Sequence, residues 1–277
     1  MHPTTFQAVV NPYQGCYIGP EQILPLFTAS TADAIARFAM VLAASIDAWR
    51  SSYQLIWLEL PASAAVLIPS ALDAGFEFHH TQPQQLTLVK KLQPNAYVPL
   101  AATHSIGVGA VVWSGNLQAP GHVLMVKERP LPNKTPGYFK LPGGMVEAKE
   151  ALATAIVREV AEETGVQAKF VGAFGLRQHH HGQFGASNIY FVCVLVAESV
   201  AKCKVGLPQL NPQAGEIDDA KWFLPTDYLA DPLASPYNKL LLQRALDAQL
   251  WTDVKVDQYR PQQADYELWL ANSASVP

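Results

Sequence analysis

The sequence has few cysteines and no excess of positive charge. Its 277 residues include three cysteines, and 19 basic against 23 acidic side chains give a formal net charge of −4. Because Cys16, Cys193 and Cys203 form no CxxC pair, we expect reduced thiols rather than a zinc site or a disulfide framework. The acidic balance argues against nucleic acid as a partner, since clustered cations are needed to hold a phosphate backbone.

The sequence also lacks a long apolar run. No stretch approaches the roughly 20 apolar residues that span a bilayer, and the first 20 residues have no basic region followed by an apolar one, as a signal peptide would. We therefore expect a cytoplasmic protein without a membrane partner. The 49% hydrophobic content is sufficient for packed cores.

The first 95 residues alternate short apolar runs with stretches of helical length. Helical patterns cover 31–49 and 62–74, and apolar runs occupy 55–60 and 86–92. This order is typical of βαβ units, so we predict a smaller α/β domain over residues 1–95. The proline-containing segment after it predicts a linker at 96–104.

Residues 105–250 show a second α/β pattern. Strands are predicted at SIGVGAVVWSG, HVLMVKER, FVGAFGLRQ, NIYFVCVLV and AKWFLP. A loop rich in proline and glycine, 130–144, precedes a helix predicted from about Glu150 to Thr164, and a last helix is predicted from about Ser235 to Leu250. We expect residues 251–277 to be a C-terminal extension whose last ten residues fray.

The helix of residues 150–164 carries an unusual stripe. Its apolar face begins with Leu152, Ala155 and Ile156 and continues, at the same helical spacing, with Glu159, Glu162 and Glu163. Like charges at this spacing repel, and they lie near the helix C-terminus, where the helix dipole disfavours anions. Something other than local preference must therefore stabilise three neighbouring carboxylates.

Two explanations of the stripe are open from the residues alone. The first is a solvated acidic patch with Arg158 and Lys149 nearby. The second is a site for a hard divalent cation, because Mg²⁺ prefers carboxylate and carbonyl oxygens and bridges to substrate phosphates. Gly143 and Gly144 just before the helix would let backbone carbonyls approach such an ion closely.

The spacing around the stripe resembles a known motif. Gly144, Glu150 and the run REVAEETGV from Arg158 to Val166 match the Nudix box, G-x5-E-x7-R-E-U-x-E-E-x-G-U with U aliphatic, at every defined position. The chain is therefore identified as resembling the Nudix hydrolases. The resemblance implies an α/β/α sandwich with a mixed sheet and hydrolysis of a nucleoside diphosphate linked to a further group X, with Mg²⁺ or Mn²⁺ as cofactor.

The resemblance also implies roles for the matched residues. Glu159 and Glu163 correspond to metal ligands, Glu162 to a ligand of a further ion or a group that helps to activate water, and the Gly143 carbonyl to a backbone ligand. Arg158 corresponds to the residue that orients the glutamates, and Glu150 and Gly144 to supporting residues. Glu216, in the later EIDDAKW, is a candidate extra carboxylate or base, and we group it with Arg158, Glu162 and Glu163 as candidate catalytic residues.

A wider resemblance covers most of the chain. The segment WLELPASAAVLIPSALDAGFEFHHTQPQQLTLVKKL is similar to the pre-Nudix domain of plant ADP-ribose and NADH pyrophosphatases and of an animal Nudix protein encoded antisense to a fibroblast growth factor. That domain resembles part of an acetyltransferase fold. We see no glycine-rich acyl-CoA loop, so dimerisation or covering the Nudix site is the role expected of it.

The substrate is specified less clearly than the reaction. We expect a small nucleoside diphosphate substrate, ADP-ribose or NADH, giving AMP, with contacts from Arg177, Gln178 and Phe139. Ser187-Asn188 replaces the Ser-Asp common in the relatives, so no aspartate role transfers there, and a metal site in His179–His181 is not expected because adjacent strand residues point apart. A catalytically weak nucleotide-binding sensor is the alternative function, and assembly as a homodimer stays open.

Overall fold

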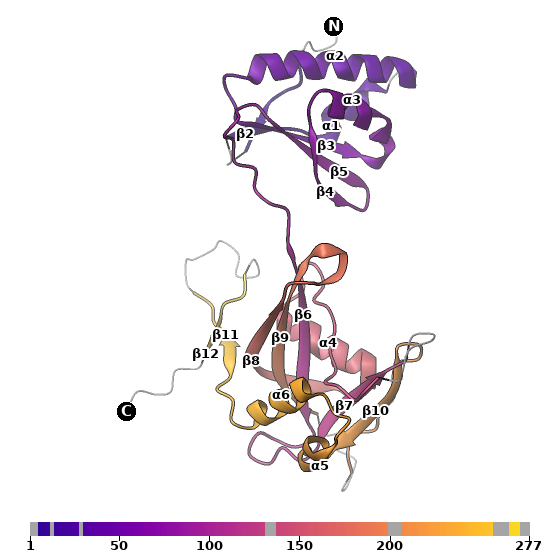
Figure 1. Cartoon of the computed structure of the whole chain (residues 1–277), viewed down its shortest axis with the longest axis vertical. Helices are drawn as coiled ribbons and strands as arrows, with labels where there is room; N and C mark the ends of the chain where they lie inside the picture. Colours follow the sequence, from indigo (N-terminus) through magenta and orange to yellow (C-terminus); the bar gives the residue numbers. More distant parts are fainter. Residues whose placement is uncertain are drawn as a thin grey trace. The chain divides into compact units, whose positions relative to one another are not determined.

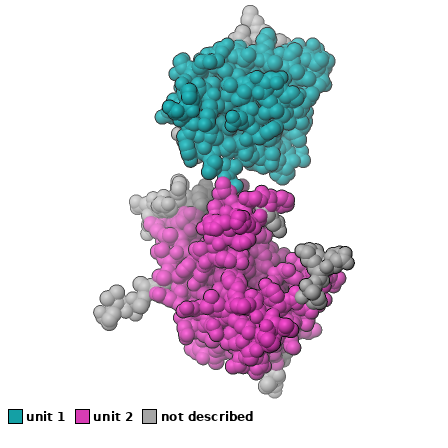
Figure 2. All heavy atoms as spheres, in the orientation of Figure 1, with its two compact units in different colours: residues 1–102 teal, residues 103–277 magenta. Residues whose placement is uncertain are grey.

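The structure is a computed structural model that describes residues 5–11, 14–27, 30–130, 137–198, 206–256 and 266–271. The chain divides into two compact units, residues 1–102 and 103–277 (Figure 2). Among the described residues, no helix is long and apolar enough to cross a membrane. Cys203 lies outside the described ranges. Of the last ten residues, which we expected to fray, Trp269–Ala271 instead form a strand, and 272–277 lie outside the described ranges.

Unit 1, residues 1–102, is built on a five-stranded sheet with the order β1-β2-β3-β5-β4. The central strand β3 pairs in parallel with β2 and antiparallel with β5. Parallel neighbours need a crossover, and α1, η1 and α2 supply it. The strands are β1 (Val9–Val10), β2 (Gly15–Ile18), β3 (Leu55–Pro61), β4 (Glu77–Gln82) and β5 (Gln85–Lys91).

The helices of unit 1 bury an apolar stripe against this sheet. The long helix α2 (Thr31–Trp49) matches the predicted bounds and places Phe38, Leu42 and Ile46, four residues apart, in the core. The helix predicted over 62–74 instead divides into η2 (Ala62–Leu67) and α3 (Ile68–Asp73), and α1 (Pro20–Ile23) and η1 (Leu24–Leu26) precede α2. The smaller α/β domain predicted here is confirmed.

Unit 2, residues 103–277, contains a seven-stranded sheet with the order β10-β7-β6-β9-β8-β11-β12 (Figure 1). Only β6 and β9 pair in parallel among its described strands, so the sheet is mixed, as predicted. The strands are β6 (His104–Trp113), β7 (Val123–Glu128), β8 (Ala168–His179), β9 (Ser187–Ala197), β10 (Ile217–Phe223), β11 (Trp251–Asp253) and β12 (Trp269–Ala271). Part of the expected C-terminal extension thus adds two strands to the sheet.

Helices cover both faces of this sheet. Val108 and Ala110 of β6 pack into a cluster with α4 (Leu152–Thr164), whereas Val111, the next residue of the strand, joins the cluster under α5 (Pro225–Ala230) and α6 (Pro236–Leu246). Alternate residues of one strand thereby serve opposite faces. This confirms the predicted α/β/α sandwich. Cys193 is buried between the layers, and burial raises the pKa of its thiol to about 12, consistent with an unreactive reduced cysteine.

Helix α4 differs from its predicted bounds only at its start. It begins at Leu152 rather than Glu150, because Ala151 has an extended backbone (φ −72°, ψ 141°) and Glu150 lies in a turn whose N–H donates to the Glu147 carbonyl at 3.1 Å. Its end follows the prediction: Gly165 has φ +74° and donates to the Ala161 carbonyl at 2.9 Å.

Candidate active site

The loop before α4 is fixed along strand β6. Val108 N–H donates to the Gly144 carbonyl at 2.9 Å, and Ala110 N–H donates to the Pro142 carbonyl at 3.0 Å. Val146 N–H returns a bond to the Ile106 carbonyl at 2.9 Å. The strand therefore holds the glycine pair of the motif in register beside the helix.

The two glycines are required for different reasons. Gly143 has φ +148°, a conformation that side chains disfavour, and a Cβ there would collide with the Val108 carbonyl. Gly144 has no such φ, but a Cβ there would lie 2.5 Å from the Glu159 carboxylate. One glycine thus permits the backbone path, and the other leaves room for a glutamate of the stripe.

Arg158 explains why the glutamates can lie together. Its Nε and Nη2 donate to the two oxygens of Glu150, each at 2.9 Å, and its Nη1 donates to Glu159 and Glu162, each at 3.0 Å. Nη2 also donates to the Met145 carbonyl at 3.0 Å. One guanidinium therefore hydrogen-bonds three carboxylates, offsets part of their negative charge and ties them to the loop.

The Arg158–Glu150 pair stays charged near neutral pH. The hydrogen bond from Arg158 is the largest cause that holds the pKa of Glu150 below its usual range, and the hydrogen bond to Glu150 is the largest that raises the pKa of Arg158. The side chains of Glu150 and Glu159 are 13% and 15% exposed, whereas that of Glu162 is 50% exposed. Glu162 is thus the member of this network that solvent reaches most easily.

Glu163 lies in a different environment from its neighbours. The residue is 4% exposed, and its Oε2 accepts a hydrogen bond from Gly143 N–H at 2.9 Å. Burial raises the pKa of this carboxyl to about 7, while the Gly143 bond and the nearby charge of Lys140 lower it and the charges of Glu159 and Glu216 raise it. The nearby positive charge is therefore too small to offset the cost of burying an ionised Glu163 carboxylate.

The donor set fits a hard divalent cation in chemistry, although the oxygens do not form a closed cage. Among the described residues, no three His, Cys, Asp or Glu side chains are grouped as a metal site, because Arg158 engages Glu159 and Glu162 while Gly143 engages Glu163. Mg²⁺ keeps several waters and needs only one or two carboxylates. Glu163, whose burial raises its pKa despite the nearby charge of Lys140, stays a predicted ligand of such an ion.

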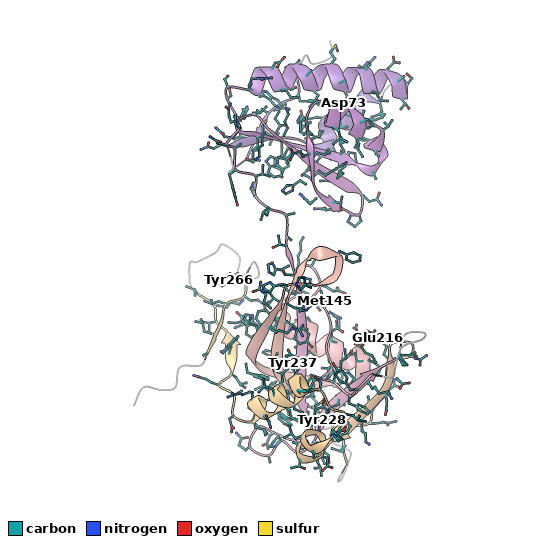
Figure 3. All side chains as sticks on the ribbon, in the orientation of Figure 1. Asp73, Met145, Glu216, Tyr228, Tyr237 and Tyr266 are labelled. Carbon is teal, nitrogen blue, oxygen red and sulfur yellow. The ribbon has the colours of Figure 1, made fainter. Side chains whose placement is uncertain are left out.

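Glu216 comes immediately before β10, where Figure 3 labels it. Its main-chain carbonyl accepts from Arg129 N–H at 2.7 Å, and its side chain is exposed. Its charge raises the pKa of Glu163. The structure therefore brings Glu216 within electrostatic reach of the predicted ligands from a separate strand.

Arg177 lies on β8 against two tyrosine rings. Its guanidinium carbon is 5.0 Å from the centre of the Tyr190 ring and 5.5 Å from that of Tyr237, at the start of α6. The Tyr190 ring crosses Gly107 and Gly109 of β6, where a Cβ would collide with it. Burial raises the pKa of Tyr190, and the charges of Tyr237 and Glu163 add to that shift while Arg177 opposes it.

The other predicted substrate contacts lie elsewhere. Gln178 follows Arg177 on the strand and thus points to the opposite face, where its Nε2 lies 2.9 Å from His104 Nε2. Phe139 is half-buried under α5: its ring is 5.0 Å from Phe223, and its carbonyl accepts from the Tyr228 hydroxyl at 2.7 Å. The three residues are not brought to one place, and their substrate roles stay predictions.

The histidine run after Gln178 ends β8 on the surface. His179, His180 and His181 are exposed, and the rings of His179 and His181 meet edge to face with centres 6.3 Å apart. Asn188, which replaces the common aspartate, accepts from Arg177 at 3.4 Å. Sequence reasoning missed three residues near the site: Tyr190 and Tyr237, which only the fold brings to Arg177, and Glu267, which contacts the start of α4.

Comparison with known proteins assigns the family. Residues 103–244 match the NUDIX domain model, and residues 6–92 match a Nudix hydrolase domain model. The chain belongs to the Nudix hydrolase family. The glutamate stripe is accordingly the Nudix box of a pyrophosphohydrolase that cleaves nucleoside diphosphates linked to a further group.

Curated relatives support this assignment. Nudix hydrolase 2 of Arabidopsis thaliana is 32% identical over 73% of this chain and 69% of its own length. Nucleoside diphosphate-linked moiety X motif 6 of Mus musculus is 38% identical over 59% of this chain and 52% of its own length. A solved NUDIX hydrolase from Nitrosomonas europaea is 16% identical, with a TM-score of 0.42, over 62% of this chain and 85% of that chain. The chain spans about half to two thirds of the curated relatives that it matches.

Proposed function

We propose that the protein hydrolyses ADP-ribose-like or NADH-like substrates to AMP with Mg²⁺ or Mn²⁺ as cofactor. The observation that carries the proposal is the pairing of buried Glu163 with the Gly143 backbone, directly beside the Arg158 network. A buried carboxylate with a raised pKa in a protein of this family marks a place where a cation is expected.

The backbone supports Gly143 as a further ligand. The Pro142 and Gly144 carbonyls on either side of it both accept hydrogen bonds from β6, which fixes the backbone at Gly143. The Gly143 N–H donates to Glu163, so this backbone lies directly beside the proposed ligands. Glu159 and Glu162 would complete the ligand set by exchanging one contact with Arg158 for the ion.

The remaining residues have distinct proposed tasks. When bound, the metal neutralises charge on the pyrophosphate and lowers the pKa of a bound water that attacks phosphorus. Arg158 orients Glu159 and Glu162 through its fork of N–H donors. Glu162, the most exposed of the three, and Glu216, at the start of a separate strand, are the carboxylates available to accept a proton from water.

Arg177 is the proposed contact for the nucleotide. Its two tyrosine neighbours hold the guanidinium in place, which leaves N–H donors for a phosphate or base edge. A cytoplasmic location and assembly as a homodimer are also proposed, and the role of the N-terminal unit as a dimerisation or covering module rests on the family resemblance alone.

A substrate panel tests the proposal. Purified protein is incubated with ADP-ribose, NADH, NAD⁺, CoA, dinucleoside polyphosphates and nucleoside triphosphates, with Mg²⁺, Mn²⁺ or EDTA, and AMP or phosphate release is measured. We expect metal-dependent AMP release from ADP-ribose or NADH and a loss of about 100-fold or more in Glu163→Gln. Tight ADP-ribose binding in calorimetry without turnover would instead favour the nucleotide sensor.

A further inference from the structure

The start of α4 has no capping group of its own. Ala151, at the N-cap position, offers no side-chain acceptor, and no acidic residue occupies the first turn. Helix N-termini carry unpaired N–H groups and positive dipole charge, so an anion there is stabilising. The helix that carries the whole glutamate stripe thus begins without the usual local stabilisation.

A carboxylate from the far end of the sequence fills this position. Leu152 N–H, the first of the helix, lies 3.1 Å from Oε2 and 3.3 Å from Oε1 of Glu267. Glu267 is 115 residues away and lies just before the last strand of the sheet. The contact therefore exists only because the end of the chain returns to the sheet.

The segment that carries Glu267 is itself held firmly. Val254 N–H donates to the Leu268 carbonyl at 2.8 Å, and Leu268 N–H donates to Asp253 Oδ1 at 3.1 Å. On β12, the Trp269 ring packs 5.6 Å from Phe170 of β8. We call β11, β12 and the described residues 254–256 and 266–268 the C-terminal hairpin.

Leu152, which Glu267 contacts, lies two residues after Glu150. Glu150 accepts hydrogen bonds from Nε and Nη2 of Arg158, and Nη1 of Arg158 donates to Glu159 and Glu162. Glu150 is held on one side by its turn with Glu147, and fraying of the first turn of α4 would free the backbone on its other side. Metal binding would then have to order this turn again.

We propose that Glu267 is a positioning residue that caps the Nudix helix and thereby fixes the carboxylates that bind the metal. It touches neither the metal nor the substrate and acts through Leu152, Glu150 and Arg158. Glu267 can have this effect only if the proposed metal site exists, so the inference rests on the proposed function.

The test compares Glu267→Gln with the wild-type chain and with Glu198→Gln. The Glu267→Gln substitution keeps one oxygen acceptor in a side chain of equal size but removes the charge and replaces the second oxygen by an amide nitrogen. Glu198 is an exposed glutamate of the same unit, immediately after β9. The first measurement is binding of Mn²⁺ alone, followed by electron paramagnetic resonance. The second is amide hydrogen exchange of Leu152 in the metal-free protein.

The expected result has two parts. In Glu267→Gln the Leu152 amide exchanges faster and the Mn²⁺ dissociation constant rises about two- to fivefold, the range that corresponds to an exposed helix-dipole interaction. Glu198→Gln should match wild type in both. Glu267→Ala should show faster Leu152 exchange and a larger Mn²⁺ dissociation constant than Glu267→Gln. If Glu267→Ala does not fold, the result for Glu267→Gln decides.

Three results would overturn the inference. Mn²⁺ binding that Glu267→Gln leaves unchanged, with faster Leu152 exchange, would show a cap that serves stability only. Unchanged Leu152 exchange would show that Glu267 does not cap the helix. A wild-type chain that binds no Mn²⁺ would remove the proposed metal site together with this inference, which distinguishes the two failures.

Discussion

Arg158 and Glu150 form a two-point contact, in which Nε and Nη2 each donate to a separate carboxylate oxygen at 2.9 Å. The planar fork of arginine matches a carboxylate in this way, and a lysine ammonium does not. The same side chain reaches Glu159 and Glu162, so its geometry sets theirs.

Replacing this arginine by lysine should therefore impair function although the charge is kept. In Arg158→Lys we expect metal-dependent turnover to fall by about 10- to 100-fold, the range for partners that orient metal ligands. Turnover is measured across a Mn²⁺ titration, with Arg244→Lys on the exposed side of α6 as the matched control. Wild-type activity in Arg158→Lys would contradict a role of the fork.

The paired glycines give a second prediction, because the obstacles at the two positions differ. A Cβ at Gly144 meets the Glu159 carboxylate, the movable end of a side chain, whereas a Cβ at Gly143 meets backbone at a disfavoured φ of +148°. Gly144→Ala should keep the melting temperature within a few degrees and weaken Mn²⁺ binding about tenfold. Gly143→Ala should lose stability first, by about 1–3 kcal/mol in urea unfolding.

Gly175→Ala is the control for both glycine variants. It lies on β8 with open space where the Cβ would be, so neither stability nor Mn²⁺ binding should change. If Gly144→Ala bound Mn²⁺ like Gly175→Ala, Glu159 would not need its present position.

The fixed spacing of the box made the glutamate helix and its loop predictable. The i, i+3, i+4 arithmetic placed Glu159, Glu162 and Glu163 together, and Gly165 marked the helix end. The sequence could not show how Arg158 binds Glu150, Glu159 and Glu162 together, or that Glu150 lies before the helix in a turn. The first depends on side-chain directions and the second on the extended backbone at Ala151, and spacing alone gives neither.

Contacts between distant segments were beyond sequence reasoning. Glu267 meets Leu152 across 115 residues, and Tyr237 meets Arg177 only because α6 packs on the sheet. Arg177, Gln178 and Phe139 were grouped by similarity to relatives, but strand alternation sends the first two to opposite faces. The weak periodicity after residue 250 likewise hid two short strands that register with β8 and each other.

The buried carboxyl of Glu163 predicts a pH-dependent stability in the absence of metal. Burial raises its pKa from an ordinary value near 4.5 to about 7. Between these values the folded chain holds a proton that the unfolded chain has released, so stability falls as pH rises through this window and is level above it. The full shift corresponds to about 3 kcal/mol.

Urea unfolding in EDTA at pH 4.5 and pH 8 measures this dependence, and Glu163→Gln isolates it. The wild-type chain should lose about 2–3 kcal/mol more than Glu163→Gln over this interval. Equal losses would mean that Glu163 is already compensated in the folded state. Mn²⁺ added at pH 8 should restore stability to wild type but not to Glu163→Gln.

The contrast between Arg177 and Gln178 provides the sharpest test of the substrate contacts. Arg177 is held by the rings of Tyr190 and Tyr237, and the charge of Glu163 contributes to the raised pKa of Tyr190. Gln178 points to the other face of the sheet and contacts His104. For the substrate that the panel identifies, Arg177→Ala should raise KM about tenfold with kcat changed by less than about threefold, since a binding contact equal in ground and transition states is lost. Gln178→Ala should leave both constants unchanged. Because Arg177→Lys keeps the charge but loses the flat stacking surface, an intermediate KM would show that the tyrosine rings hold Arg177 in place, and a wild-type KM would show that charge alone suffices.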